Sequence, residues 1–178
     1  MSLELKISNK KITTESKPYI IAEACINHEG NIKIAKKMID KAVIAGVSAV
    51  KFQFHVLEDE MLTKTPKSKN FTHSLYSTLK RTNLSIKEHQ ELKKYCEKNG
   101  VDYLCTPFSF KSADILEKEI KLKLFKVGSG ELTNIPLQLH IAKKKYPTII
   151  STGMSTFNEV KHTFNKVKKI NKNIALTQ

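Results

Sequence analysis

Three charged side chains lie inside otherwise apolar segments of this chain: Glu23, Lys51 and Lys126. Burying a charged group costs free energy unless the group is paired or binds a ligand. In a sheet of parallel strands the C-terminal ends of the strands lie at one edge, and ligands bind there. We therefore expect these three side chains to converge on one polar site at that edge.

Other polar residues recur near the ends of the same apolar segments: Asn27, Gln53, Thr106, Ser109, Ser129, Glu131, Ser151 and Thr152. Two lysines with several hydroxyl groups suit an anion that carries a phosphate and a carboxylate, because lysine supplies charge and hydroxyls supply donors. Gly128 and Gly130 allow the backbone to approach an anion closely. Taken singly, each hydroxyl is better explained as a satisfied strand-end group, and each lysine is equally well explained by an ion pair. The recurrence over five segments favours a binding site.

The segments that carry these residues are short and rich in Ile, Val, Leu and Phe, which is typical of buried strands. We predict strands at residues 19–25, 49–54, 101–106, 124–129 and 148–152, and the start of a sixth at 173–178. Segments with apolar residues at helical spacing lie between them, at residues 31–46, 86–100, 110–120, 135–145 and 156–170. Ser85 is expected to cap the N-terminus of its helix, and Gly46 and Gly100 are expected to end theirs.

The alternation of strands and helices predicts an α/β fold with a parallel sheet covered by helices. An open doubly wound sheet and a closed TIM-type (β/α) barrel both fit this order. The short repeating unit and the lack of a G-x-G-x-x-G segment after the first strand favour the barrel. Five βα units and a sixth strand fall short of the eight strands of such a barrel, so we expect an incomplete barrel over residues 18–178, after a lead-in at residues 1–17. The polar connection at residues 55–84 is expected to hold a short helix around residues 73–80.

The composition argues against several classes of protein. The 178 residues suit one domain, and neither a signal peptide nor a bilayer-spanning segment is evident, so we expect a cytoplasmic protein. The formal net charge is +14. Most lysines fall on the polar faces of the predicted helices, which favours a solvated surface over a nucleic-acid or polyanion-binding module. Cys25, Cys96 and Cys105 match no metal-binding motif, and we expect Cys25 and Cys105 to be buried thiols.

Several blocks of the sequence resemble the N-acetylneuraminate (sialic acid) synthase family, which includes legionaminate and pseudaminate synthases. The first block is IIAEACINHEGNIKIAKKMIDKAVIAGVSAVKFQ. A single residue, Phe54, separates it from the next block, HVLEDEM. LCTPFS, FKVGSGELTNIPL and IISTGMST then occur in the family's order. The resemblance covers residues 18–178, and several blocks in the right order are more specific than any one motif.

The resemblance implies that the enzyme joins phosphoenolpyruvate to an N-acylated amino sugar and releases phosphate. It assigns phosphoenolpyruvate binding to Lys51, Thr106, Lys126 and Ser129, with assistance from Ser151 and with Gln53 lining the same pocket. Glu23 is the implied catalytic residue, which holds sugar hydroxyls and orients the open-chain aldehyde. Asn70 falls where the family has an asparagine that contacts the sugar. The acceptor stays open among N-acetylmannosamine, its 6-phosphate and diacetamido trideoxy sugars, with the EDEM segment favouring N-acetylneuraminate or legionaminate chemistry.

The resemblance also implies a divalent metal (Mn²⁺ or Mg²⁺), a homodimer and a C-terminal antifreeze-like domain. This sequence contains neither the family's two metal-binding histidines nor its Cys-Thr-(Ser or Asn)-x-Tyr-Pro block nor that domain. We therefore expect the 178-residue chain to be inactive by itself. A non-catalytic remnant of such an enzyme remains an alternative, and a basic polyanion-binding module is a weaker one.

Overall fold

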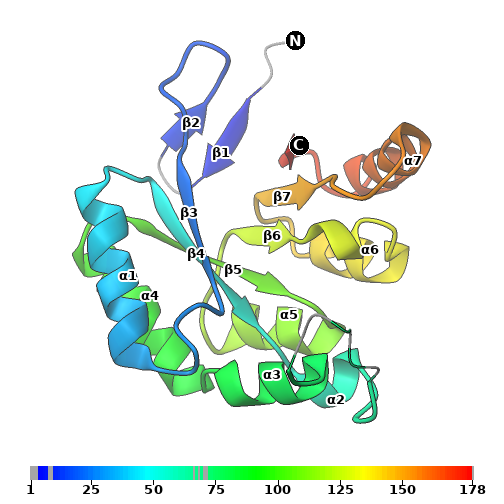
Figure 1. Ribbon diagram of the computed structural model, residues 1–178. Helices are drawn as coiled ribbons and strands as arrows, with labels where there is room; N and C mark the ends of the chain where they lie inside the picture. Colours follow the sequence, from blue (N-terminus) through cyan, green and yellow to red (C-terminus); the bar gives the residue numbers. More distant parts are fainter. Residues whose placement is uncertain (1–3, 8–9, 66, 68, 70–71, 178) are drawn as a thin grey trace.

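A six-stranded parallel sheet forms the centre of the molecule, in a computed structural model that describes residues 4–7, 10–65, 67, 69 and 72–177. Its strands are β3 (Ile21–Cys25), β4 (Ala49–Phe54), β5 (Asp102–Pro107), β6 (Phe125–Val127), β7 (Thr148–Ser151) and β8 (Ile174–Thr177). They lie side by side in chain order, and every pair is parallel. Figure 1 shows that the sheet curls as part of a barrel wall does. The expected α/β fold with an incomplete barrel is confirmed.

Helices follow the strands and cover one face of the sheet. They are α1 (Ile32–Ile44), α2 (Leu57–Glu60), α3 (Leu75–Thr82), α4 (Ile86–Lys98), α5 (Phe110–Lys118), α6 (Ile135–Lys143) and α7 (Phe157–Lys168). Ser85 caps α4 in a capping box with Glu88, as predicted. Gly46 and Gly100 adopt φ angles of +76° and +73° just after α1 and α4, where a glycine is favoured. In the described part of the chain, no helix is both long and apolar enough to cross a membrane.

The two faces of the sheet differ because successive side chains of a strand point in opposite directions. On the helix-covered outer face, Phe52, Cys105 and Phe125 belong to the large core cluster. On the inner face, Leu104, Leu124 and Ile149 form a separate small cluster near the N-terminal ends of the strands. The inner-face residues two positions further along these strands are Thr106, Lys126 and Ser151. The inner face therefore changes from apolar to polar between one inward-facing residue of each strand and the next.

An antiparallel hairpin precedes the sheet, where only a lead-in was expected. Its strands are β1 (Leu5–Ile7) and β2 (Lys10–Ile12), and Figure 1 shows it on the side of the sheet away from the helices. Leu5 and Ile7 are buried against Leu104, Leu124 and Ile149, so the hairpin closes the apolar end of the inner face. Asn173, just before β8, fastens it: the Asn173 side chain accepts from Lys6 N and donates to Lys6 O, both at 3.2 Å.

Most element boundaries differ from the sequence prediction by one or two residues, and two of these differences bear on the site. The strand expected at 124–129 ends at Val127, and Ser129–Glu131 forms a 3₁₀ turn. The glycines on either side of Ser129 favour that turn over an extended strand. The short helix expected around residues 73–80 is present as α3 at Leu75–Thr82, with Ser74 as its N-cap.

Candidate functional site

Glu23 and Lys51 form an ion pair at the C-terminal end of the inner face. The two residues are partners in the β3–β4 register, and the Lys51 ammonium contacts the Glu23 carboxylate. The Lys51 side chain is 7% exposed, whereas that of Glu23 is 50% exposed. The register shifts between Glu23 and Cys25, and Cys25 adopts a φ of +51°. A bulge of this kind redirects a strand end, and here it lies beside the charged pair.

Lys126 approaches the same place from β6. Its ammonium contacts the Ser151 hydroxyl and donates to the Val127 carbonyl at 3.1 Å. Burial and, secondly, the positive charge of Lys51 lower the pKa of Lys126 to about 8, while Glu23 acts in the opposite direction. The sequence expectation that Glu23, Lys51 and Lys126 lie near one another at one edge is therefore met by the geometry.

Hydroxyl groups line the space around the two lysines. Thr106 is a register partner of Gln53, and it is 1% exposed. Its hydroxyl has no hydrogen-bond partner among the described residues, which is unusual for a buried polar atom. A ligand that accepts a hydrogen bond would satisfy this atom.

Ser129, in the turn after β6, lies against the loop that follows β7. A methyl group added to Gly153 would lie 2.9 Å from the Ser129 hydroxyl oxygen. That distance is too short for a side chain, so a glycine is needed for the loop to lie against Ser129. Ser129 thus lies against the loop that follows Ser151, and Ser151 contacts Lys126.

Some of the residues singled out in the sequence lie elsewhere or have structural partners. Asn70 lies outside the described residues. Ser109 caps the N-terminus of α5 and Glu131 accepts a hydrogen bond from Asn134, so both are satisfied locally. The Thr152 hydroxyl donates to the Thr177 carbonyl at 3.1 Å, which joins the loop after β7 to β8.

Two residues near the site were not identified from the sequence. Cys25 is only partly buried, contrary to the expectation of a buried thiol, and its sulfur lies 3.6 Å from a Glu23 oxygen. Burial is the main reason that the pKa of Cys25 is raised, and Lys51 opposes this shift. The Thr177 hydroxyl lies 3.3 Å from that of Ser151. Alternation along the sixth predicted strand was the available signal for Thr177, whereas the bulge that exposes Cys25 has no evident sequence signal.

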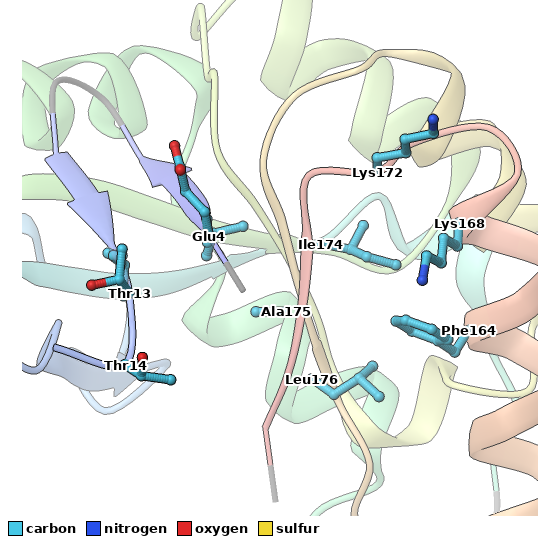
Figure 2. Close-up of a pocket in the computed structure, with 11 residues that line it drawn as sticks. Glu4, Thr13, Thr14, Phe164, Lys168, Lys172, Ile174, Ala175 and Leu176 are labelled. Atoms are coloured by element: carbon cyan, nitrogen blue, oxygen red, sulfur yellow. The ribbon is translucent and has the colours of Figure 1, made fainter. Parts of the chain in front are cut away.

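A separate apolar pocket lies between the hairpin, α7 and β8 (Figure 2). Its lining includes Ile174, Leu176 and Phe164, with Lys168 and Lys172 at its side. None of the described site residues lines it. The main residues that the sequence singled out therefore lie at the polar end of the inner face and not beside this pocket.

The polar end of the inner face is suited to an anion. Donors come from four strands or their loops: two ammonium groups, two serine hydroxyls and the buried Thr106 hydroxyl, which no described residue engages. Within the described ranges no group of three or more His, Cys, Asp or Glu side chains is arranged to hold a metal ion. These residues therefore do not fit the expected Mn²⁺ or Mg²⁺, and no chemical step is derived through a metal.

Solved structures with the same fold define the class of protein. The chain superposes with a TM-score of 0.84 on the N-acetylneuraminic acid (sialic acid) synthetase of Leptospira borgpetersenii, crystallised with citrate, at 29% identity over 99% of this chain and 59% of that one. A DAHP synthase of Thermotoga maritima shares the fold alone, with a TM-score of 0.69 at 13% identity. The fold is therefore that of the barrel-type synthases.

Sequence comparisons narrow the class to one family. The NeuB family profile matches residues 38–178. The N,N'-diacetyllegionaminic acid synthase of Campylobacter jejuni is 37% identical over 162 residues, which cover 86% of this chain and 47% of that protein. Human N-acetylneuraminate-9-phosphate synthase is 32% identical over 100% of this chain and 51% of its own length. The chain belongs to the NeuB family, and it spans about half the length of the curated relatives it matches.

Proposed function

We propose that this chain provides the phosphoenolpyruvate-binding wall of a nonulosonic acid synthase. The observation that carries the proposal is the pair of buried lysines, Lys51 and Lys126, on the inner face. Beside them lies the buried Thr106 hydroxyl, which has no hydrogen-bond partner in the part of the chain that the structure describes. Two separated positive charges match the phosphate and the carboxylate of one small molecule. The named activities of relatives, which are synthases of legionaminic, pseudaminic and phosphorylated sialic acids, support the same assignment.

In this reaction C3 of phosphoenolpyruvate attacks the aldehyde carbon of an open-chain N-acylated amino sugar. Water adds at C2, and phosphate leaves with cleavage of its C–O bond. Lys51, Lys126, Thr106 and Ser129 bind the two anionic groups, and Ser151 holds the Lys126 ammonium in place. Gln53 lines the same space, while the half-exposed Glu23 binds the sugar hydroxyls and orients the aldehyde. The fold alone does not choose among the candidate acceptor sugars.

The remaining parts of the assignment concern the whole enzyme. We propose that a homodimer is the active form, that Asn70 contacts the sugar and that a divalent metal is held by residues other than those described. A non-catalytic relative of the family would keep the anion site and differ only in turnover. Binding and turnover must therefore be measured separately.

The binding test uses calorimetry with the 178-residue chain and phosphoenolpyruvate. Lys51→Ala should weaken binding about tenfold or more, since a hydrogen bond to a charged group contributes about 1.5–3 kcal/mol. Lys118→Ala, which removes an exposed lysine of α5, is the matched control and should bind like the parent. Equal affinity of the parent and Lys51→Ala would place the anion elsewhere.

Alkylation of Cys25 offers a second readout that needs no turnover. This thiol is partly accessible beside Glu23, whereas Cys96 and Cys105 are buried and serve as internal controls. Phosphoenolpyruvate should slow the reaction of Cys25 with iodoacetamide, as measured by mass spectrometry. An unchanged rate at saturating ligand would contradict the proposed location.

A further inference from the structure

The His55 side chain, directly after β4, is held on every side. Its Nδ1 lies 2.7 Å from a Glu60 oxygen, and both side chains are only 4% exposed. The ring stacks on Phe108 with 4.4 Å between centroids and 13° between planes. The Asn83 amide donates to the His55 carbonyl at 2.9 Å. The imidazole therefore has one orientation.

Glu60 is equally constrained. Its second carboxylate oxygen accepts a hydrogen bond from the Val56 backbone at 2.6 Å, so both oxygens have partners. Because an ionised carboxylate only accepts hydrogen bonds, the His55 nitrogen that faces Glu60 must carry a hydrogen. The contact with Glu60 holds Nδ1 on one side of the ring and so directs Nε2 to the other side. The partner of one ring nitrogen often sets how the other nitrogen acts in a functional site.

The other ring nitrogen faces the side chain of Gln53. His55 Nε2 lies 3.3 Å from the side-chain oxygen of Gln53. Gln53 follows Lys51 by two residues on the inner face, and its register partner is Thr106. A glutamine amide has a donor end and an acceptor end, and the end that a neighbour engages decides which one is left for a ligand.

We propose that His55, held by Glu60, is a positioning residue that sets the amide of Gln53 for ligand binding. In the doubly protonated ring both nitrogens donate, Nδ1–H to Glu60 and Nε2–H to the Gln53 oxygen. The Gln53 NH₂ group is then left to donate toward the space between the lysines. This inference rests on the proposed function only for the identity of the ligand. The positioning of Gln53 itself is a property of the free chain and is measured without any ligand.

A purely structural role for the pair makes a different prediction. The His55–Glu60 pair would then only anchor the segment after β4, and its loss would weaken the fold without acting through Gln53. His55→Phe separates the two cases, because it keeps a ring to stack on Phe108 and removes both nitrogens. His162→Phe, on the exposed face of α7, is the matched control.

The first arm records the side-chain NH₂ resonances of ¹⁵N-labelled chain, with the Gln53 pair assigned by its loss in Gln53→Ala. His55→Phe should shift the Gln53 pair and speed its exchange with water, and Glu60→Gln should shift it in a variant that keeps the imidazole. His162→Phe should leave it unchanged. Gln53 resonances that stay in place in both His55→Phe and Glu60→Gln would overturn the proposal.

The second arm is a double-mutant cycle on phosphoenolpyruvate affinity in the same chain. His55→Phe should weaken binding by about tenfold in the parent and by much less in Gln53→Ala, since residues that act through one another are not additive. An equal loss in both backgrounds, or no loss in either, would overturn the role in binding. If the parent itself does not bind phosphoenolpyruvate, the proposed function fails while the resonance arm still decides the positioning.

Discussion

The two ends of the inner face are built by the same strands and differ in every other respect. Leu104, Leu124 and Ile149 meet the hairpin and are buried in a small apolar cluster. Two residues further along the same strands, the Thr106 hydroxyl lacks a partner within the described ranges, and Lys126 has a pKa lowered to about 8 by burial and by Lys51. One end is satisfied by its own side chains, whereas the other end holds two buried ammonium groups and, among the described residues, a hydroxyl without a hydrogen-bond partner.

On each strand, the residue expected to contribute to stability and the residue expected to bind a ligand are only two positions apart. In (β/α) barrels the N-terminal end of the strands mainly contributes stability, and the C-terminal end carries the chemistry. A site prepared for an anion holds like charges close together and leaves donors unused, which costs free energy in the free protein. Substitutions at the two ends should therefore change different measurable quantities.

The largest expected effect is on stability, from Leu104→Ala at the apolar end. Removing this fully buried side chain should lower the free energy of unfolding by about 2–5 kcal/mol, through lost burial and a new cavity. Thr106→Val, two residues along the same strand, keeps the shape and removes the unpartnered hydroxyl, so it should leave stability unchanged or raised. Urea unfolding of both variants measures the change. A similar fall in the free energy of unfolding for both would show that the two ends contribute equally to stability.

The next effect is on binding, from Lys126→Met at the polar end. The substitution keeps most of the side-chain volume and removes a buried charge that lies near Lys51. Phosphoenolpyruvate affinity should fall about tenfold or more, which corresponds to the loss of one charge-assisted contact. The free energy of unfolding should not fall, because the ammonium costs free energy to bury. A variant that loses binding and stability together would show that Lys126 is mainly structural.

The smallest effect is the pH dependence that follows from the lowered pKa of Lys126. As the pH rises through about 8, Lys126 loses its charge and phosphoenolpyruvate affinity should decline. Between about 8 and its ordinary pKa of 10.5, Lys126 binds fewer protons in the folded chain than in the unfolded chain. Its contribution to stability should therefore rise with pH across that window. Both trends should be absent in Lys126→Met, and calorimetry and urea unfolding at several pH values test them.

The sequence predicted the secondary structure well where apolar residues recur regularly over a long segment. Each main strand and helix was predicted, because apolar residues recur at spacings that only one element type buries. The proximity of Lys51 and Lys126 followed from topology, since parallel strands present their C-terminal ends at one edge. The roles of the site residues stay predictions, because proximity does not identify the bound molecule.

Other features depend on contacts that the sequence does not display. The hairpin strands Leu5–Ile7 and Lys10–Ile12 are three residues each and half lysine, too short for a periodic signal. Their burial depends on an apolar surface contributed by β5, β7 and the residue before β6. The exposure of Cys25 depends on a register shift between two strands, which is set by their pairing and not by local composition.

The fastening of the hairpin by Asn173 has a consequence for the order of folding. Every strand of the sheet pairs with the strand made just before or after it, so the sheet can grow progressively as the chain leaves the ribosome. The hairpin is synthesised first, yet the side chain that ties it down is 167 residues later. Contacts of such large sequence separation form slowly, because a long loop must close first. We therefore expect the hairpin to dock late, and Leu5 and Ile7 to stay uncovered until the strands that carry Leu104 and Ile149 are in place.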